Sequence, residues 1–298
     1  MIFKKLSLGD KNSIDKYISP YKFLSCEYSF TSLYIWKDAC DIQYTIYKNA
    51  LILKKKDFDG NYHFMQPIGY VMKDLGEIIE KLKEYREEND MKYLFKDLDE
   101  NFIAEFNALH NEKNEFYIQE DRDNFDYLYE AKKLMTLSGK KLHSKKNHYN
   151  AFTKSYSYEV LEINDKIVIN DVCDAAQKWF EETNEKDIKL YYELLAIKDI
   201  VNNMALLNLN GIAVYVNGKI AAFSIGESLN EKLAVIHIEK GDKSINGIYS
   251  FISKTFIDKC FNNAEIINRE QDLGIDGLRK SKMSYYPLRL EKKFILSF

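Results

Sequence analysis

Polar side chains suited to acid–base chemistry gather near the ends of two expected strands in the second half of the chain. His237 and Glu239 interrupt the otherwise apolar run VIHIE, while Asn268, Arg269 and Glu270 form part of an unbroken polar row. Charge buried without a partner costs free energy, so these groups must pair with each other or with a ligand. A salt-bridge network at a strand end is the structural alternative to a wall of a substrate site.

The spacing of these residues predicts which side chains face one another. Because side chains alternate along a strand, His237 and Glu239 should share one face, and Asn268 and Glu270 should point away from Arg269. We expect the two strands to be parallel neighbours, and ligands in open α/β sheets bind beyond the carboxyl ends of such strands. For His237 alone, a core histidine with satisfied hydrogen bonds is the alternative.

The elements that position these residues occur in a similar order in both halves of the chain. The second half reads strand, helix, helix, hairpin, strand, helix, strand, helix, strand, and an aromatic segment at 23–36 without a clear period replaces the second helix in the first half. The Asn217-Gly218 pair predicts the tight turn of the hairpin, and the expected last strand lies near 288–297. Helices are expected at 71–88, with one apolar face, and at 101–111; the apolar face is Leu75, Ile78, Ile79, Leu82 and Tyr85. This order of elements predicts an α/β fold with mixed sheets (α+β), built from two domains of one type in tandem. The expected ranges are 1–130, a basic connecting segment at 131–157, and 158–298.

Composition limits the class of protein. The chain has 298 residues, a net charge of −3 and a pI near 6.0, which argue against general nucleic-acid affinity but allow a local basic patch. Its four cysteines form no CxxC pair and indicate a reduced, cytoplasmic protein without a zinc site. No run approaches the roughly 20 apolar residues of a membrane span, so we expect a soluble protein.

A basic segment without any Asp or Glu extends from residue 131 to residue 158 and contains seven lysines. Such a patch could hold the phosphates of a carrier molecule, and a tRNA acceptor stem bound there would show steep salt dependence. A solvated surface helix and linker is the alternative. The candidate phosphate-binding residues are Lys145, Lys146, Asn147, His148 and Asn150.

Seven segments spread over nearly the whole chain carry a resemblance to known proteins. They are CEYSFTSLYIW (26–36), MQPIG (65–69), FDYLYE (125–130), LSGKKLHSKKNHYNAF (137–152), AFSIGESLN (222–230), HIEKGD (237–242) and INREQDLGIDGLRKSKMSYYP (267–287). In these segments the chain resembles the C-terminal catalytic domain of phosphatidylglycerol lysyltransferases, and its order of elements is similar to the GNAT acyltransferase fold. The resemblance implies two tandem GNAT-like acyltransferase domains, as in Fem-type aminoacyltransferases, which move an aminoacyl group from aminoacyl-tRNA to an amine or hydroxyl. The loop at 241–247 lacks the Gly-x-Gly or Gly-x-Ala pattern with which GNAT enzymes bind acyl-CoA.

We therefore expect acyl or aminoacyl transfer to an acceptor amine or hydroxyl by direct attack, which needs a base, an oxyanion donor and an acid. Glu239 is the candidate base, with His237 beside it. Asn268 or a backbone N–H could hold the carbonyl, and Tyr285 could protonate the leaving group.

A second set of residues is expected to hold the substrate. Arg269, Arg279 and Lys282 would anchor an anionic part of the donor or acceptor, with Glu270 in the same wall. For Arg279 and Lys282, a solvated helix face is the alternative.

Two other functions fit the sequence. One is an acyl-CoA-dependent N-acyltransferase, and the other is a non-catalytic module that binds a small molecule. The expected co-substrate is aminoacyl-tRNA or acyl-CoA, with no covalently bound cofactor and no metal. The expected partners are tRNA and a small-molecule or peptide acceptor.

Overall fold

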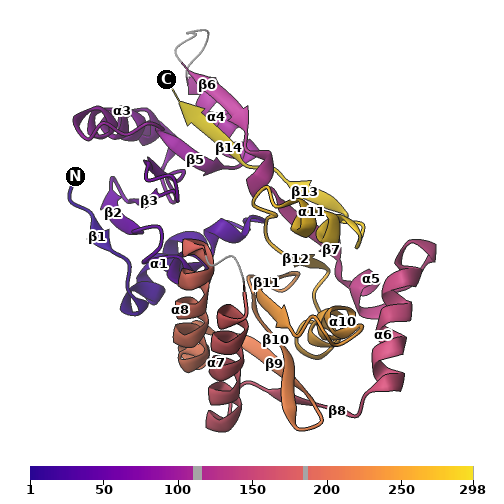
Figure 1. Cartoon of the computed structure of the whole chain (residues 1–298). Coiled ribbons are helices and arrows are strands. Elements are labelled where there is room, and N and C mark those ends of the chain that lie inside the picture. Colours follow the sequence, from indigo (N-terminus) through magenta and orange to yellow (C-terminus); the bar gives the residue numbers. More distant parts are fainter. Residues whose placement is uncertain (110–115, 184–186, 298) are drawn as a thin grey trace. The chain divides into compact units, whose positions relative to one another are not determined.

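The computed structural model describes residues 1–109, 116–183 and 187–297 (Figure 1). The chain divides into two compact units, each of which is described by itself below. Unit 1 comprises Met1–Phe125 and Glu291–Phe298, and unit 2 comprises Asp126–Leu290.

Unit 2 is built on a mixed sheet with the strand order β13-β7-β12-β11-β10-β9-β8. The β9–β10 hairpin turns at Asn217 and Gly218, whose φ values of 50° and 74° confirm the tight turn predicted from the Asn-Gly pair. Strands β11 and β12 are parallel, as predicted. The strands are β7 (Asp126–Glu130), β8 (Tyr158–Glu162), β9 (Asn210–Val216), β10 (Lys219–Ser228), β11 (Leu233–Gly241), β12 (Ile266–Asn268) and β13 (Arg289–Glu291).

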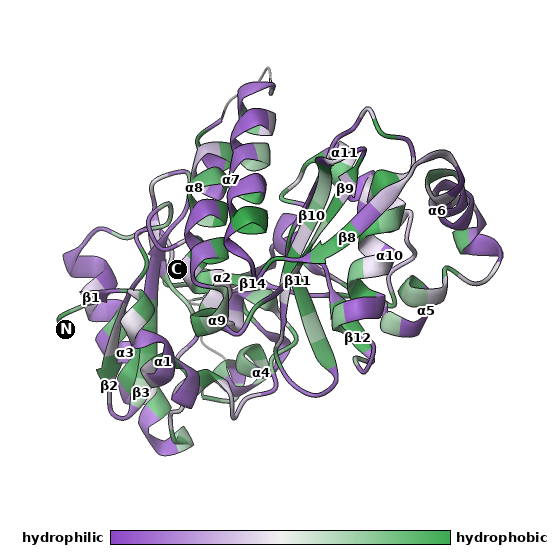
Figure 2. Cartoon of the chain, turned by 90° about the horizontal axis from the view of Figure 1, so that it is seen from below, coloured by the Kyte–Doolittle hydropathy of each residue, from purple (hydrophilic) through white to green (hydrophobic). Residues whose placement is uncertain are grey.

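Helices cover both faces of this sheet (Figures 1 and 2). Helix α10 packs on β9, β10 and β11 and is itself covered by α5 and α6, whereas α7 and α8 pack together on the other face. Asp165 and Asp187 start α7 and α8 by accepting hydrogen bonds from the backbone N–H groups of Ile167 and Leu190. The helices are α5 (Ala131–Thr136), α6 (His143–Ser155), α7 (Lys166–Glu181), α8 (Ile188–Asn202), α9 (Met204–Leu207), α10 (Ile248–Cys260) and α11 (Asp276–Met283), with a 3-10 turn η4 (Lys140–Leu142).

Unit 1 has a sheet of the same kind, with the order β1-β2-β3-β4-β5-β14-β6. Helix α3 buries the apolar face predicted from its period against β3, β4 and β5, through Leu75, Ile78, Ile79 and Leu82. The strands are β1 (Lys4–Lys5), β2 (Gln43–Tyr47), β3 (Ala50–Lys56), β4 (Tyr62–Phe64), β5 (Phe95–Leu98), β6 (Tyr117–Glu120) and β14 (Phe294–Ser297). The helices are α1 (Lys11–Ile18), α2 (Phe30–Ile35), α3 (Met72–Glu88) and α4 (Glu100–Leu109), with 3-10 turns η1 (Leu8–Asp10), η2 (Cys26–Tyr28) and η3 (Arg122–Asn124).

The two sheets have equivalent orders, which confirms the prediction of two mixed α+β units of one type. Counted from β1 in unit 1 and from β8 in unit 2, the sixth position of each sheet is held by a strand distant in sequence, β14 and β7 respectively. The units therefore differ from the expected ranges: unit 1 ends its first part at Phe125 and also includes residues 291–298, and unit 2 begins at Asp126 and ends at Leu290. The expected last strand is split between the two sheets as β13 and β14, and the expected connecting segment is α5, η4 and α6, which pack within unit 2. The expected helix at 101–111 is α4, and residues 110 and 111 lie outside the described part of the chain.

Candidate active site of unit 2

Strand β11 extends well beyond the point where its parallel neighbour β12 ends. Strand β12 pairs with β11 only from Leu233 to Val235, whereas β11 continues beside β10 as far as Gly241. The edge of β11 after Val235 therefore has no ladder partner in β12, and the residues that leave β12 place side chains beside it. This is the edge at which the sequence predicts a site.

A β-bulge lies at His237 within this extension. The β10–β11 register runs from Ile225 opposite Ile238 to Gly226 opposite Ile236, so His237 is an extra residue on β11. The bulge breaks the strict alternation on which the prediction of a shared His237–Glu239 face depended. Among the described residues no contact joins the two side chains, and the expected couple is replaced by two separate pairs.

His237 is held between two carboxylates. Its Nδ1 lies 2.8 Å from Glu270 Oε1 and its Nε2 lies 3.0 Å from Glu227 Oε1, and the imidazole is buried. Burial lowers the pKa of His237, but the hydrogen bonds with Glu227 and Glu270 outweigh it and raise the pKa to about 9. At neutral pH the ring is therefore an imidazolium that donates a hydrogen bond to each acid and holds Glu270 in place.

Glu270 reaches β11 because of its backbone conformation. Its φ of 55° lies in the left-handed region, which is uncommon for a non-glycine residue. This breaks the expected alternation after β12, so that Arg269 and Glu270 both reach β11 side chains. Glu270, predicted to bind substrate, is instead the partner of His237.

Glu239 and Arg269 form the second pair. Arg269 Nη2 donates to Glu239 Oε1 over 2.7 Å, and the guanidinium lies 4.8 Å from the ring centroid of Tyr285. Burial lowers the pKa of Arg269, but the charge of Glu239 outweighs it, so the guanidinium stays charged. Within the described part of the chain, Glu239 Oε2 and Arg269 Nη1 are buried and make no hydrogen bond of ordinary geometry. The pair thus keeps one acceptor and one donor without such a hydrogen bond, and the hydroxyl of Tyr285 interacts with the same guanidinium and raises its pKa.

Tyr285 lies between two cations. The ammonium group of Lys145, from α6, is 4.2 Å from the ring centroid, and Arg269 lies on the same ring. Burial raises the pKa of Tyr285 against the opposing charge of Arg269, so its phenol is protonated at neutral pH. Burial, followed by the charge of Arg269, lowers the pKa of Lys145. The structure therefore brings Glu239, Arg269, Tyr285 and Lys145 together.

Asn268 does not present its amide to the site. Its Nδ2 donates to Asp126 Oδ2 over 2.8 Å, its Oδ1 accepts from the Glu270 N–H over 2.7 Å, and the side chain is buried. The predicted role in holding a carbonyl is corrected by this geometry, because the amide joins β12 to β7 and fixes the turn that follows.

The basic side chains of α11 also have internal partners. The guanidinium of Arg279 binds the buried Asp272 through Nε at 2.9 Å and Nη2 at 2.8 Å. Lys282 Nζ donates to the backbone carbonyl of Arg269. The prediction that both anchor an anionic substrate is corrected, because these contacts attach α11 to the residues after β12.

The remaining predicted phosphate-binding residues lie on the exposed part of α6, which is largely hydrophilic (Figure 2). Lys141, from η4, places its ammonium group 5.2 Å from the ring centroid of Tyr286. We call this region the basic surface, defined by Lys140, Lys141, Lys145, Lys146, Asn147, His148, Asn150 and Lys154. Its lysines form no ion pair with any described residue, although Asn147 contacts His143 at 3.4 Å.

The N-terminus of α10 is covered by α6. Gly247 precedes the helix with a φ of 82°, and a Cβ atom at this position would lie 2.2 Å from the backbone carbonyl oxygen of His148. Only glycine allows this approach of the two backbones. The helix terminus that would bind a phosphate in other α/β proteins is thus in contact with α6.

Sequence reasoning missed Glu227, Asp126 and Asp272 as partners in the site. Glu227 could have been suspected, because it is an acid within the apolar strand sequence AAFSIGES. Asp126 and Asp272 gave no such signal, since each lies in a locally polar stretch.

Unit 1 contains a second buried charge network that the sequence did not indicate. Lys55 Nζ lies 2.8 Å from Glu27 and 2.7 Å from Asp97, and Lys293 Nζ lies 3.5 Å from Glu27. Asp97 has a φ of 58°, like Glu270 in unit 2. Opposite charges match within this network, so it fits a role in holding the elements of unit 1 together.

Comparisons with known proteins agree with this architecture. The family model described as "Phosphatidylglycerol lysyltransferase, C-terminal" matches residues 19–297. A conserved protein of unknown function from Bacteroides thetaiotaomicron is 31% identical, with a TM-score of 0.90 and 100% coverage of both chains. L-PGS from Bacillus licheniformis is similar in fold (TM-score 0.65, 14% identity, 97% of this chain and 91% of that chain).

Two further matches show how much of this chain is similar to other proteins in fold or in sequence. A tandem GNAT protein from the clavulanic acid biosynthesis pathway shares the fold across 99% of this chain and 97% of its own (TM-score 0.53, 7% identity), which confirms the tandem GNAT-like prediction. An uncharacterised protein of Mycoplasmoides gallisepticum is 30% identical over 184 residues, which is 60% of this chain and 57% of that relative. None of the helices in the described ranges has the length and apolar character needed to cross a membrane.

Proposed function

We propose an acyltransferase function for this chain, which belongs to the phosphatidylglycerol lysyltransferase C-terminal family. The reaction is transfer of an acyl or aminoacyl group from a carrier, preferably aminoacyl-tRNA, to an acceptor amine or hydroxyl. The observation that carries the proposal is the buried Glu239–Arg269 pair beside the edge where β12 ends, which keeps one acceptor and one donor without a hydrogen bond of ordinary geometry among the described residues. Buried polar atoms without such bonds cost free energy, which a ligand that binds them would offset.

The pair and Tyr285 supply the three groups that direct attack requires. The acceptor atom attacks the carbonyl carbon of the carrier ester, and Glu239 Oε2 takes the proton that the acceptor loses. Arg269 Nη1 donates a hydrogen bond to the carbonyl oxygen as negative charge develops there. Tyr285 donates its proton to the carrier oxygen as the bond from that oxygen to the carbonyl carbon breaks.

Access to the pair requires movement of the side chains that cover it. Tyr285 lies on Arg269, and Lys145 lies on Tyr285. A substrate that reaches Arg269 must therefore displace part of this stack. Once bound, it would occupy a site from which water is excluded, where the charge of Arg269 acts more strongly than in water.

The basic surface supports tRNA over acyl-CoA as the carrier. Apart from Lys145, which lies on Tyr285, its lysines are exposed and form no ion pair within the described ranges, so they are available to phosphates. Acyl-CoA would need an open helix N-terminus for its pyrophosphate, and the backbone of α6 lies against the corresponding end of α10.

The test is a transfer assay on the full chain with two labelled donors, a pool of aminoacyl-tRNAs and a set of short acyl-CoAs, each offered with mixed amine and hydroxyl acceptors. We expect label to move from aminoacyl-tRNA and not from acyl-CoA. Transfer from acyl-CoA alone would keep the reaction class but overturn the carrier. Binding of either donor without any transfer would overturn the proposal in favour of a non-catalytic binding module.

A further inference from the structure

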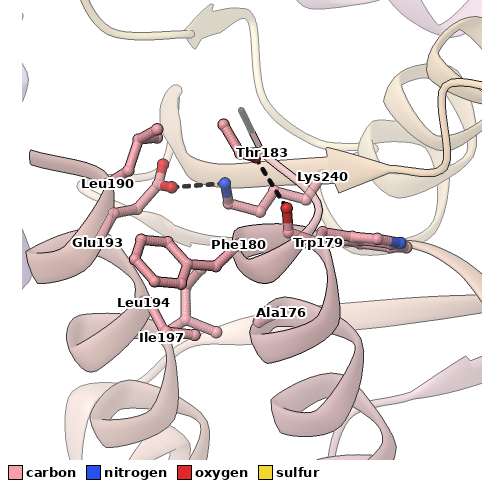
Figure 3. A pocket seen from close by; sticks show the side chains of 9 residues that line it. All are labelled: Ala176, Trp179, Phe180, Thr183, Leu190, Glu193, Leu194, Ile197 and Lys240. Carbon is pink, nitrogen blue, oxygen red and sulfur yellow. Dashed lines mark hydrogen bonds and ion pairs between the residues drawn. The ribbon is translucent and has the colours of Figure 1, made fainter. Parts of the chain in front are cut away.

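A small pocket opens between α7 and α8, next to the end of β11 (Figure 3). Its volume of about 260 Å³ includes space that is open to solvent, so only a compact group fits between the two helices. Trp179 is held in the wall by stacking on Phe223, with ring centroids 5.7 Å apart and an interplanar angle of 8°. The apolar walls are formed by Ala176, Trp179, Phe180, Leu190, Leu194 and Ile197.

Thr183 and one ion pair complete the lining of this pocket. Lys240 Nζ lies 2.5 Å from Glu193 Oε1, and the two side chains are 28% and 27% exposed. Figure 3 shows this pair next to Phe180 of α7 and between Leu190 and Leu194 of α8. Partly exposed pairs contribute little net stability, so a ligand can separate this pair at low cost.

The two charges select the class of ligand. A carboxylate alone would pair with Lys240 but would place a second negative charge beside Glu193. An amine alone would pair with Glu193 and leave Lys240 facing a like charge. A zwitterion pairs with both side chains without changing the net charge of the site. If it also carries an apolar side chain, that group would bury the apolar wall residues and shield them from water.

We propose that this pocket binds a free α-amino acid with a compact apolar side chain. The carboxylate of the amino acid lies on the ammonium group of Lys240, its ammonium group lies on Glu193, and its side chain lies between α7 and α8. Lys240 directly follows Glu239 in β11, and because side chains alternate along a strand, the pocket lies on the opposite face of the sheet from the Glu239–Arg269 pair. The inference is therefore independent of the proposed function.

The test is calorimetric titration of the full chain with L-leucine and three related compounds. 4-Methylpentanoate lacks the ammonium group, 3-methylbutylamine lacks the carboxylate, and glycine lacks the apolar side chain. We expect L-leucine to bind at least about tenfold more tightly than each of the three, because each loses one charge-assisted contact or the apolar contact.

Variants of the ion pair identify the contacts. Lys240→Met should remove the preference for L-leucine over 3-methylbutylamine, and Glu193→Gln should remove the preference over 4-methylpentanoate. Lys178→Met is the matched control, because it breaks an exposed ion pair with Glu182 on the same helix and should leave all four affinities unchanged. The exchanged variant with Lys240→Glu and Glu193→Lys keeps a pair and controls for loss of folding.

The outcomes separate this inference from the proposed function. L-leucine binding with these preferences supports the pocket, even if no acyl group is transferred to leucine. Absence of L-leucine binding to the wild-type chain, or equal loss of affinity for all compounds in both folded single variants, overturns it. That result would leave the proposed transfer reaction unaffected.

Discussion

Replacement of His237 by Gln should remove a large pH-dependent part of the stability of unit 2. The two carboxylates that flank the ring, Glu227 on β10 and Glu270 after β12, raise the pKa of His237 from 6.5 to about 9. At about 1.4 kcal/mol per unit, that shift corresponds to about 3 kcal/mol of folding free energy. Because the folded-state pKa is raised, this contribution is fully present below pH 6.5 and is lost as the pH rises through about 9.

The assay is urea unfolding of the wild type and of His237→Gln at several values between pH 6 and pH 9.5. The difference in unfolding free energy between the two proteins should shrink by about 3 kcal/mol across this range. His143→Gln, at an exposed histidine of α6, should show no such change. A constant difference between wild type and His237→Gln would refute the reasoning that the ring is charged between the two acids.

Three further predictions concern packing and charge. In a urea titration, Gly247→Ala should lower the unfolding free energy more than Gly60→Ala does, by at least about 2 kcal/mol. Both glycines have a positive φ, but only Gly247 lies against a backbone carbonyl. Asp272→Asn should lower the unfolding free energy by about 3 kcal/mol in the same assay, because it leaves the Arg279 guanidinium without its counter-charge. An unchanged urea midpoint would show that stability does not depend on this ion pair. Replacement of Lys140, Lys141 and Lys146 of the basic surface by Gln should reduce the slope of log affinity for tRNA against log salt by about 1 per lost phosphate contact. The same replacement of three control lysines, Lys16, Lys22 and Lys73, should leave the slope unchanged.

Hydrophobic periodicity and turn chemistry were enough to predict most elements of the fold. The apolar face of α3 and the Asn217–Gly218 turn are local features, and each was correctly predicted from a few adjacent residues. The aromatic stretch from Phe23 to Trp36 had no clear period, and it forms a 3-10 turn and the short helix α2. Its side chains are buried on nearly all sides, which removes the alternation of apolar and polar residues that periodicity analysis needs.

The exchange of strands between sheets could not be predicted from local pattern. The run from Leu288 to Ser297 looks like one strand, but it is divided between two sheets at residues 292 and 293. Which sheet a strand joins depends on pairing with residues far away in sequence. Strand β14 pairs with β5 and β6, and β12 pairs with β7 as well as with β11, and the pairings with β5 and β7 cannot be recognised from composition.

The polar side chains at the ends of β11 and β12 lie close together as predicted, but they form other pairs than the predicted ones, and their role in a functional site stays a prediction. The prediction assumed regular strands, whereas the bulge at His237 and the positive φ of Glu270 redirect the side chains. These two irregularities determine that His237 binds Glu270 and that Arg269 binds Glu239. Backbone irregularities of this kind are stabilised by tertiary contacts, so single-sequence reasoning does not detect them.

The most direct test of the account is the single-turnover rate of transfer by Glu239→Gln, with aminoacyl-tRNA as donor. Gln keeps an oxygen that can accept the hydrogen bond from Arg269 but cannot take the proton of the acceptor. We expect the rate to fall by about 10²–10⁴-fold, with tRNA affinity unchanged and with Glu231→Gln, at an exposed position, behaving as wild type. A folded Glu239→Gln protein that transfers at the wild-type rate would contradict the central claim that the Glu239–Arg269 pair carries the reaction.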